Sequence, residues 1–300
     1  MTTATQVHLD VNRRQDFVLL FDVTDGNPNG DPDAGNLPRV DPETMQGLVT
    51  DVAIKRKVRD WVDAARGDEA RYKIYVQRET YLTETRERVF GARAQGRKDV
   101  QPSEAQQWMC QEFYDIRMFG AVMSMKEHNA GQVRGPLQFT FARSIDPIVP
   151  LDSSIARVAL ETRGERQTGQ DLDDLTAPTH GTLGRKATVP YGLYRAHGFF
   201  NPHFAQRTGV TEEDMELFWQ AVMNMWDLDR SSSRGLMACQ GLYVFAHESR
   251  LGNAPAHRLF QRIQVRRNDG VDAPRSFSDY TVVVDDSALP EGVTLIRLVE

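Results

Sequence analysis

The stretch from Asp16 to Val23 is the part of this sequence that most limits how the chain can fold. It reads DFVLLFDV, an apolar run of strand length, and such a run bounded by turn residues is typical of a buried strand. Residues 26–38 follow directly and are crowded with Gly, Pro, Asn and Asp, which predicts a loop. Residues 44–65 then carry Leu, Val and Trp at roughly helical spacing, which predicts a helix. This order of elements brings the loop and the helix side by side.

The rest of the sequence predicts strands alternating with helices. Strands are predicted at 72–77, 135–144, 187–199, 242–246, 281–284 and 293–298. Two helices are predicted, each opened by a capping pattern: 103–114, with Ser103 and Gln106, and 211–226, with Thr211 and Asp214. No unit of about 20–50 residues repeats, which excludes solenoids and propellers. We therefore expect one α+β domain spanning residues 1–300, interrupted by insertions.

Two stretches have the character of insertions. Residues 79–101 are charged and contain glycine without a clear period. Residues 163–188 form a long polar excursion rich in Gly, Asp and Thr, and loops longer than about 12–15 residues in compact domains are usually functional or disordered.

Charge is distributed unevenly along the chain. The net charge is −6 and the pI is about 5.7, which taken whole argues against a protein coated in basic surface for nucleic acid. Residues 55–98, however, hold 13 basic and 7 acidic side chains. The densest part is Lys55, Arg56, Lys57 and Arg59. This block is either a solvated helix face or a patch that contacts phosphates, because phosphate contacts need only positive charge and donors.

Cysteine content and hydropathy exclude several classes of protein. Cys110 and Cys239 lie far apart in the sequence and outside any CxxC pattern, so neither a disulfide scaffold nor a structural zinc site is expected. The first ten residues are polar, unlike a signal peptide. The longest apolar runs are far shorter than the ~20 residues of a membrane helix. We expect a cytoplasmic protein.

The predicted loop after the first strand has four possible roles. Its sequence from Asp25, DGNPNG, matches the first half of a calcium-binding loop, but Asn36 stands where a bidentate Glu is required. The loop can instead be a structural turn, or it can offer Asn amides and backbone N–H groups to a ligand. Its carboxylates can alternatively bind a divalent metal for phosphodiester cleavage; the candidates are Asp22, Asp25, Asp31 and Asp33.

Four segments place an arginine close to a glycine. They are RMFG with Arg117 and Phe119, GQVRGP with Arg134, GRK with Arg185 and Lys186, and SSSRG with Ser231 and Arg234. Glycine lets backbone N–H groups approach a phosphate, arginine supplies a matching fork, and a nearby aromatic ring can stack on a base. Each segment alone is equally compatible with a tight turn that carries a surface arginine. Together they indicate RNA binding.

Six blocks, in order, resemble one family closely. They are FDVTDGNPNGDPD, VTDVAIKRKVRDWV, MFGAVMS, GQVRGPLQF, GRKATVPYGLYRAHG and SSSRGLMACQGLYVFAHESRLGNAPAH. This combination resembles the CRISPR-associated backbone subunit of type I interference complexes, the Cas-seven group, and in particular its type I-C branch. The resemblance runs from about Phe17 to the C-terminus.

The resemblance implies an RRM-like (ferredoxin-like) palm that carries two insertions. Residues 72–115 resemble the fingers and residues 163–188 the thumb, a protruding loop or hairpin in which Leu172 and Leu175 are the candidates for displacing a nucleotide. It also implies that copies polymerise along one CRISPR RNA, together with other type I-C subunits, and present its spacer to target DNA. No cofactor and no catalysis are implied.

The site expected from the residues and the resemblance is a phosphate path. Its predicted members are Asn27, Asn29, Lys55, Arg56, Arg59, Arg117, Phe119, Arg134, Arg185, Lys186, Ser231 and Arg234. Recognition should be of backbone and shape, because the spacer sequence must vary freely. The alternative function is a metal-dependent ribonuclease that uses the Asp22–Asp33 loop.

Overall fold

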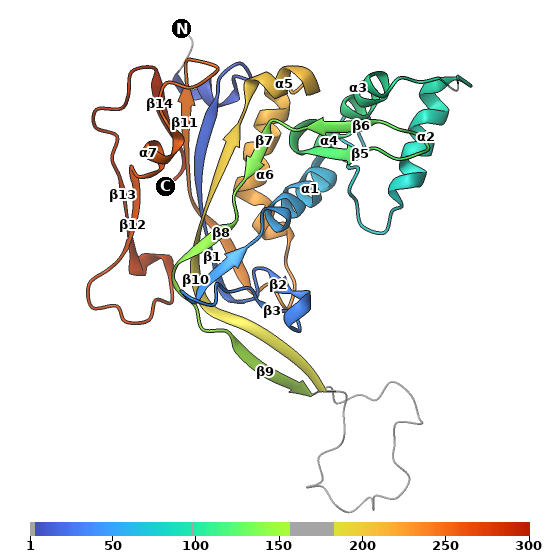
Figure 1. The fold of residues 1–300 in the computed structure, drawn as a ribbon. Helices are drawn as coiled ribbons and strands as arrows, with labels where there is room; N and C mark the ends of the chain where they lie inside the picture. The colour runs from blue at the N-terminus through green and yellow to red at the C-terminus, as the bar shows by residue number, and fades with distance from the viewer. Residues whose placement is uncertain (1–3, 98, 157–182) are drawn as a thin grey trace, which may run out of the picture.

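An eight-stranded antiparallel sheet forms the centre of the molecule, which the computed structural model describes over residues 4–97, 99–156 and 183–300 (Figure 1). Its strands run in the order β14-β11-β1-β10-β8-β4, and β7 and β9 also pair with β10. They are β1 (Gln15–Gly26), β4 (Gln46–Val49), β7 (Leu137–Phe139), β8 (Ala142–Pro147), β9 (Leu151–Ala156), β10 (Leu183–Phe200), β11 (Leu236–His247) and β14 (Val293–Val299). The predicted mixture of helix and strand, and most predicted strands, are confirmed.

Two long helices cover one face of this sheet (Figure 1). They are α1 (Asp51–Arg66) and α6 (Glu212–Leu228), and they pack on the first-face core that contains Phe17, Leu19 and Phe21 of β1. Alternate residues of a strand point to opposite faces, so Val18 and Leu20 lie on the other side. The predicted capping box of Thr211 and Asp214 opens α6.

The second face is covered by a short helix and a hairpin at the left of Figure 1. These elements are α7 (Ala256–Phe260), β12 (Ile263–Arg267), the 3-10 turn η4 (Phe277–Asp279) and β13 (Tyr280–Val284). Leu259, Phe260 and Ile263 pack there against the second-face residues of β1. The sheet is thus the middle of three layers.

A mainly helical unit stands at the side of the sheet (Figure 1). It contains α2 (Leu82–Ala94), α3 (Pro102–Glu112), α4 (Tyr114–Phe119), β5 (Gly120–Met123) and β6 (Gly131–Arg134), with a separate apolar core between them. Two sequence predictions are wrong here. Residues 72–77 form no strand. Within this segment only Lys73 pairs with another residue, in an isolated bridge to Phe113. Ser103 caps nothing, because α3 begins at Pro102 after Gln101.

A two-stranded ribbon projects from the sheet where β9 pairs with the first part of β10 (Figure 1). Arg185 and Lys186 lie on this ribbon. Residues 183–188 of the predicted thumb are therefore strand, whereas Leu172 and Leu175 lie outside the described residues.

The remaining elements are short. The first loop, between β1 and β4, contains β2 (Gly30–Asp31), η2 (Pro32–Ala34) and β3 (Leu37–Pro38). The other two short elements are η1 (Ala4–Leu9) and α5 (Pro202–Thr208). The helix predicted over 44–65 begins only at Asp51, because residues 46–49 pair with β8 as β4. In the part of the chain that the structure describes, every helix falls short of the length and apolarity of a bilayer span.

Candidate nucleic-acid interface

An open groove of ≈ 800 Å³ lies between the first loop, the middle and last part of α1 and the C-terminal end of α6. We call it the α1 groove. Its lining comes from Asn27, Asn29, Gly30, Asn36, Lys57, Asp60, Asp63, Ala64, Gln77, Arg78, Met225, Leu228, Asp229, Arg230, Ser231, Ser233 and Arg234. Of the predicted phosphate path, this groove brings together Asn27, Asn29, Ser231 and Arg234.

The first loop and the turn before β11 are built as one unit. The N–H of Asn27 donates to Ser233 O at 2.7 Å, and the Arg234 guanidinium donates to Asn27 O at 3.0 Å. Gly26 has to be glycine, because a Cβ there would lie 1.8 Å from Arg234 O. Segments more than 200 residues apart in the sequence therefore meet at the groove wall.

The two asparagines of the first loop shape it and anchor α1. Asn27 is 3% exposed and donates from Nδ2 to Asn36 O at 2.8 Å. Asn29 Oδ1 accepts from both the N–H and the hydroxyl of Thr50, at 2.9 and 3.0 Å. Thr50 in turn caps α1 by accepting from Ala53 N–H at 3.2 Å. The Asn27 side chain is thus held by the loop itself, and its contact with RNA stays a prediction.

An ion-pair cluster around the buried Lys57 forms the floor of the groove. Asp229 pairs with Lys57 and, at 3.1 Å, with Arg234. Lys57 is 3% exposed and lies 5.8 Å from the Trp226 ring centroid. Burial lowers the pKa of Lys57 below its ordinary value, although the Asp229 carboxylate acts in the opposite direction. Packing therefore fixes the position of the Lys57 side chain, which lies at the boundary between the core and the groove.

Two exposed arginines line the groove near its rim. Arg78 donates to Asp60 at 3.0 Å, and Arg230 pairs with Asp227. The segment that carries Arg78 is held against α1 by Gln77, whose side chain donates to Asp63 at 2.9 Å. Every cation lining the groove among the described residues therefore has a carboxylate partner within the chain.

None of the predicted basic residues of α1, which are Lys55, Arg56 and Arg59, lines the α1 groove. Lys55 lies 2.8 Å from Gln138 and 3.1 Å from Asp51, and Arg59 lies 2.8 Å from Asp115. Both cations lie over the ring of Phe119, which is itself buried. Arg56 donates to Val76 O at 3.1 Å and is partly exposed. Lys55, Arg59 and Phe119 thus join α1 to the helical unit, and their contact with RNA stays a prediction.

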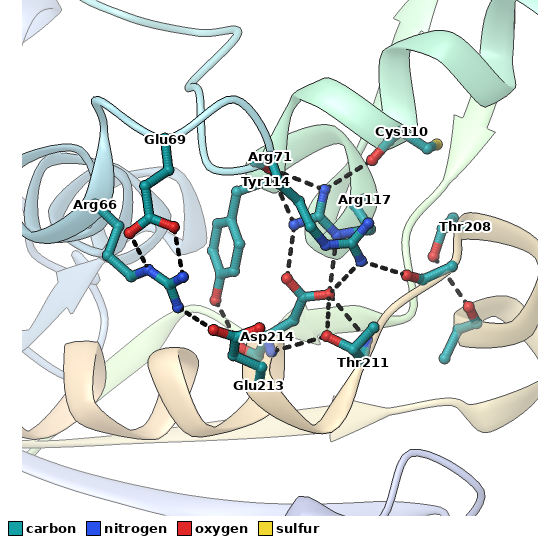
Figure 2. A network of polar contacts seen from close by, with 12 residues as sticks. Arg66, Glu69, Arg71, Cys110, Tyr114, Arg117, Thr208, Thr211, Glu213 and Asp214 are labelled. Carbon is teal, nitrogen blue, oxygen red and sulfur yellow. Dashed lines mark hydrogen bonds and ion pairs between the residues drawn. The ribbon is translucent and has the colours of Figure 1, made fainter.

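Arg117 has a structural role that the sequence did not reveal. Its side chain is fully buried and donates to both oxygens of Asp214, at 2.6 and 3.0 Å, and to Cys110 O at 2.7 Å (Figure 2). Burial acts to raise the pKa of Asp214, but the Arg117 guanidinium outweighs it and holds that pKa below its ordinary value. Arg117 has no access to a phosphate, so its predicted place on the RNA path is wrong.

The other predicted cations lie elsewhere on the surface. Arg134 is exposed on β6 and covers the ring of Phe204, with 4.4 Å between guanidinium carbon and ring centroid. Arg185, 84% exposed, stands on the β9–β10 ribbon 3.9 Å from Asp152, beside the half-buried Lys186. None of these three lines the α1 groove.

The carboxylates proposed for a metal do not converge. Asp22 lies on the second face of the sheet, where it accepts from Tyr191 and Gln240, and burial raises its pKa. Asp31 caps η2 and lies 3.3 Å from Arg39. Over the described ranges, His, Cys, Asp and Glu nowhere form a group of three suited to a metal ion. Among the described residues, the carboxylates of the Asp22–Asp33 segment therefore do not form a shared metal site.

Sequence reasoning missed several groove residues. Lys57 was visible in the basic block, but nothing in the sequence separated it from its neighbours. No sequence motif marks Arg78, Arg230 or Asp229. They reach the groove only because the fold packs α1, the end of α6 and the first loop together.

Comparison with known proteins finds relatives along most of the chain. The family model for CRISPR-associated protein Cas7 matches residues 13–285. The CRISPR-associated protein Cas7 of Haloferax volcanii is 27% identical over 312 residues, which cover 96% of this chain and 84% of that protein. Chains of similar structure occur in a CRISPR RNA-guided surveillance complex in a pre-nicking state (TM-score 0.49, 13% identity, 77% of this chain and 78% of that chain) and in the type III-B Cmr-beta complex bound to cognate target RNA (TM-score 0.40, 11% identity, 77% and 61%). The match over residues 13–285 shows that the chain belongs to the CRISPR-associated protein Cas7 family.

Proposed function

We propose that this chain is the non-catalytic backbone subunit of a cytoplasmic type I-C interference complex. In this proposal, copies polymerise along one CRISPR RNA beside other subunits and present its spacer to target DNA. The central sheet serves as the RRM-like palm, residues 72–115 as the fingers and residues 163–188 as the thumb. Membership of the Cas7 family and the six sequence blocks support this assignment.

The α1 groove is the observation that carries the proposal. It combines Arg78, Arg230 and Arg234 with the hydroxyls of Ser231 and Ser233 along one open surface, above the buried Lys57. Phosphate oxygens accept from such donors whatever the base sequence, and these contacts fix register without reading sequence. A guide-binding subunit needs this kind of recognition, because each guide has a different spacer.

The carboxylates of the groove hold its cations in positions where a strand with several phosphates can contact them. Asp229 bridges Lys57 and Arg234, and Asp60 holds Arg78. A single phosphate gains little by displacing one carboxylate partner. A continuous strand contacts several of these cations at once, so its phosphates compete effectively.

Substitution of the two exposed groove arginines tests the proposal. We expect Arg78→Gln with Arg230→Gln to weaken binding of unrelated single-stranded RNAs equally, since both side chains are on the surface and the fold should be kept. The slope of log affinity against log salt should fall by about 0.7 for each phosphate that the variant no longer neutralises. Arg207→Gln, on the exposed side of α5, is the matched control. Affinities measured by fluorescence anisotropy over a salt series decide the matter.

Two outcomes contradict the proposal. Unchanged affinity and slope in the double variant would remove the α1 groove from the RNA path. Magnesium-dependent cleavage of bound RNA that EDTA stops and Asp31→Ala abolishes would show a ribonuclease.

A further inference from the structure

The second face of the sheet carries a pocket that the α1 groove does not explain. It has a volume of ≈ 860 Å³ and lies between β10, α7 and β12. We call it the β12 pocket. Arg195 and His197 of β10, His257 and Phe260 of α7, and Gln264 and Arg266 of β12 line it. The full thickness of the sheet separates it from the helices α1 and α6 (Figure 1).

The sequence around this pocket is locally basic in an acidic chain. Residues 256–267 contain four arginines and one histidine but no Asp or Glu. No carboxylate is among the residues that line the pocket. Two of the four arginines are already occupied, because Arg262 lies 3.4 Å from Asp285 and Arg267 lies 3.7 Å from Asp146.

The other two arginines, Arg258 and Arg266, have no carboxylate partner among residues 4–97, 99–156 and 183–300. Both are exposed, and Arg266 donates only to the neutral amide of Gln264, at 2.6 Å. The α1 groove differs in this respect, because each of its cations is ion-paired within the chain. Uncompensated positive charge around a concave surface attracts polyanions.

The floor of the pocket is flat, rigid and aromatic. The ring of His197 stacks on Phe260, with 4.3 Å between centroids and 19° between planes. Arg195 locks this pair in place by donating to Phe260 O at 2.5 Å, to Ile263 O at 2.7 Å and to His197 Nε2 at 3.1 Å.

The stacked His197–Phe260 pair of the floor is also uncharged at neutral pH. Burial, and secondly the neighbouring Arg195 guanidinium, lower the pKa of His197 to about 4. The ring is therefore neutral, and the positive charge without a carboxylate partner lies on Arg266, which lines the pocket, and on Arg258, which follows the lining residue His257 in α7. A flat aromatic floor beside exposed arginines is the arrangement that binds single strands, because every base has a face that stacks and every nucleotide has a phosphate.

We infer that the β12 pocket is a second binding site for a single-stranded nucleic acid, across the sheet from the α1 groove. Arg266 at the pocket and Arg258 on the adjoining surface of α7 contact phosphates of the strand, and the His197–Phe260 floor supports a base, with the exposed His257 at its edge. The site goes beyond the proposed guide binding, because it takes a strand while the groove is occupied. Duplexes fit it poorly, since their bases are already stacked.

The test uses the full chain saturated with an unlabelled RNA. A fluorescein-labelled thymidine oligonucleotide of about 10 nucleotides, a length within the usual range for one single-strand site, is then titrated in. We expect Arg258→Gln with Arg266→Gln to weaken its binding and to lower the salt slope by about 1.4, which corresponds to two phosphates. Arg207→Gln is again the control, and thermal unfolding of all variants shows that the fold is kept. The matching RNA oligonucleotide is run in parallel to decide between DNA and RNA.

Cross-linking locates the bound strand directly. With bromouridine in the oligonucleotide, the expected adducts are on residues 257–266, mapped by mass spectrometry. Adducts confined to α1 or 228–234, or a double variant that binds like the control, would overturn the inference. Equal displacement of the strand by polyglutamate and by unlabelled oligonucleotide also overturns it, and identifies a docking surface for an acidic protein.

The outcome is separable from that of the proposed function. If the wild-type chain binds no RNA in the α1 groove, the proposed function fails. The comparison of Arg258→Gln/Arg266→Gln with Arg207→Gln on the RNA-free chain still decides whether the β12 pocket binds a strand.

Discussion

Arg117 and Lys57 are both cations that the chain buries, and their surroundings give them different roles. Arg117 satisfies both oxygens of Asp214 and two backbone carbonyls inside the core. Lys57 meets Asp229 at the floor of an open groove. The sequence motif around Arg117, an arginine near a glycine, is shared with Arg234 and contains nothing about burial. Burial depends on α6, which supplies Asp214 from almost a hundred residues away.

Removal of the Arg117 guanidinium should be strongly destabilising. We expect Arg117→Ala to lower the free energy of unfolding by about 3–5 kcal/mol, because Asp214 is left charged and buried without its main partner. Arg71→Gln removes the other, partly exposed cation that pairs with Asp214 and should cost no more than about 1 kcal/mol. Urea unfolding of both variants measures the difference. Similar losses of stability in the two variants would show that the buried Arg117–Asp214 pair contributes no more than the partly exposed Arg71–Asp214 pair.

At the scale of elements, the predictions that succeeded were those that depend on local pattern. β1 and α6 were predicted nearly to their ends, because an apolar run and a capping box at Thr211 are local signals. The start of α1 was misplaced, because β4 is created by pairing with β8 almost a hundred residues later. Residues 72–77 failed for a related reason: Asp115 accepts the N–H groups of Tyr75 and Val76, so this segment is held by a side chain and not by a neighbouring strand.

The first loop stabilises the start of α1. Thr50 caps the helix and is itself held by Asn29. We expect Thr50→Ala to lower the free energy of unfolding by about 1 kcal/mol, as for other N-cap removals, and to weaken RNA binding by loosening the groove wall. Thr50→Ser keeps the capping oxygen and should behave like the wild type. Urea unfolding and RNA titration measure both effects, and equal results for Ala and Ser would refute the role of the cap.

For the molecule as a whole, the net charge of −6 is a poor guide to its surfaces. Much of the positive charge of residues 55–98 is engaged in ion pairs within the chain, among them those at Asp60, Asp115 and Asp229. Free positive charge instead lies at 256–267, on the other face of the sheet. Composition and local blocks predicted a single domain of helices and strands with insertions and a nucleic-acid partner. Only the folded chain shows which cations remain free, because pairing joins residues from distant parts of the sequence.

Assembly provides the prediction at this scale. If copies polymerise along a guide, the mass of the complex should increase with RNA length in steps of one 34.0 kDa subunit plus the RNA it covers. Size-exclusion chromatography with light scattering measures the mass for a series of RNA lengths. A mass that stays at one subunit, whatever the RNA length, would argue against a backbone role even if RNA binds.

The position of β1 has a consequence for the synthesis of the protein. β1 is an early strand, but both of its neighbours are late: Phe17 pairs with Gly198 of β10 and with Val244 of β11. A ribosome therefore has to complete most of the chain before the central strand finds either partner. Contacts between such distant residues form slowly, and apolar strands without partners are prone to aggregation. The wall of the α1 groove also requires Arg234 beside Asn27, so a nascent chain gains this groove only after more than 200 further residues have followed the first loop.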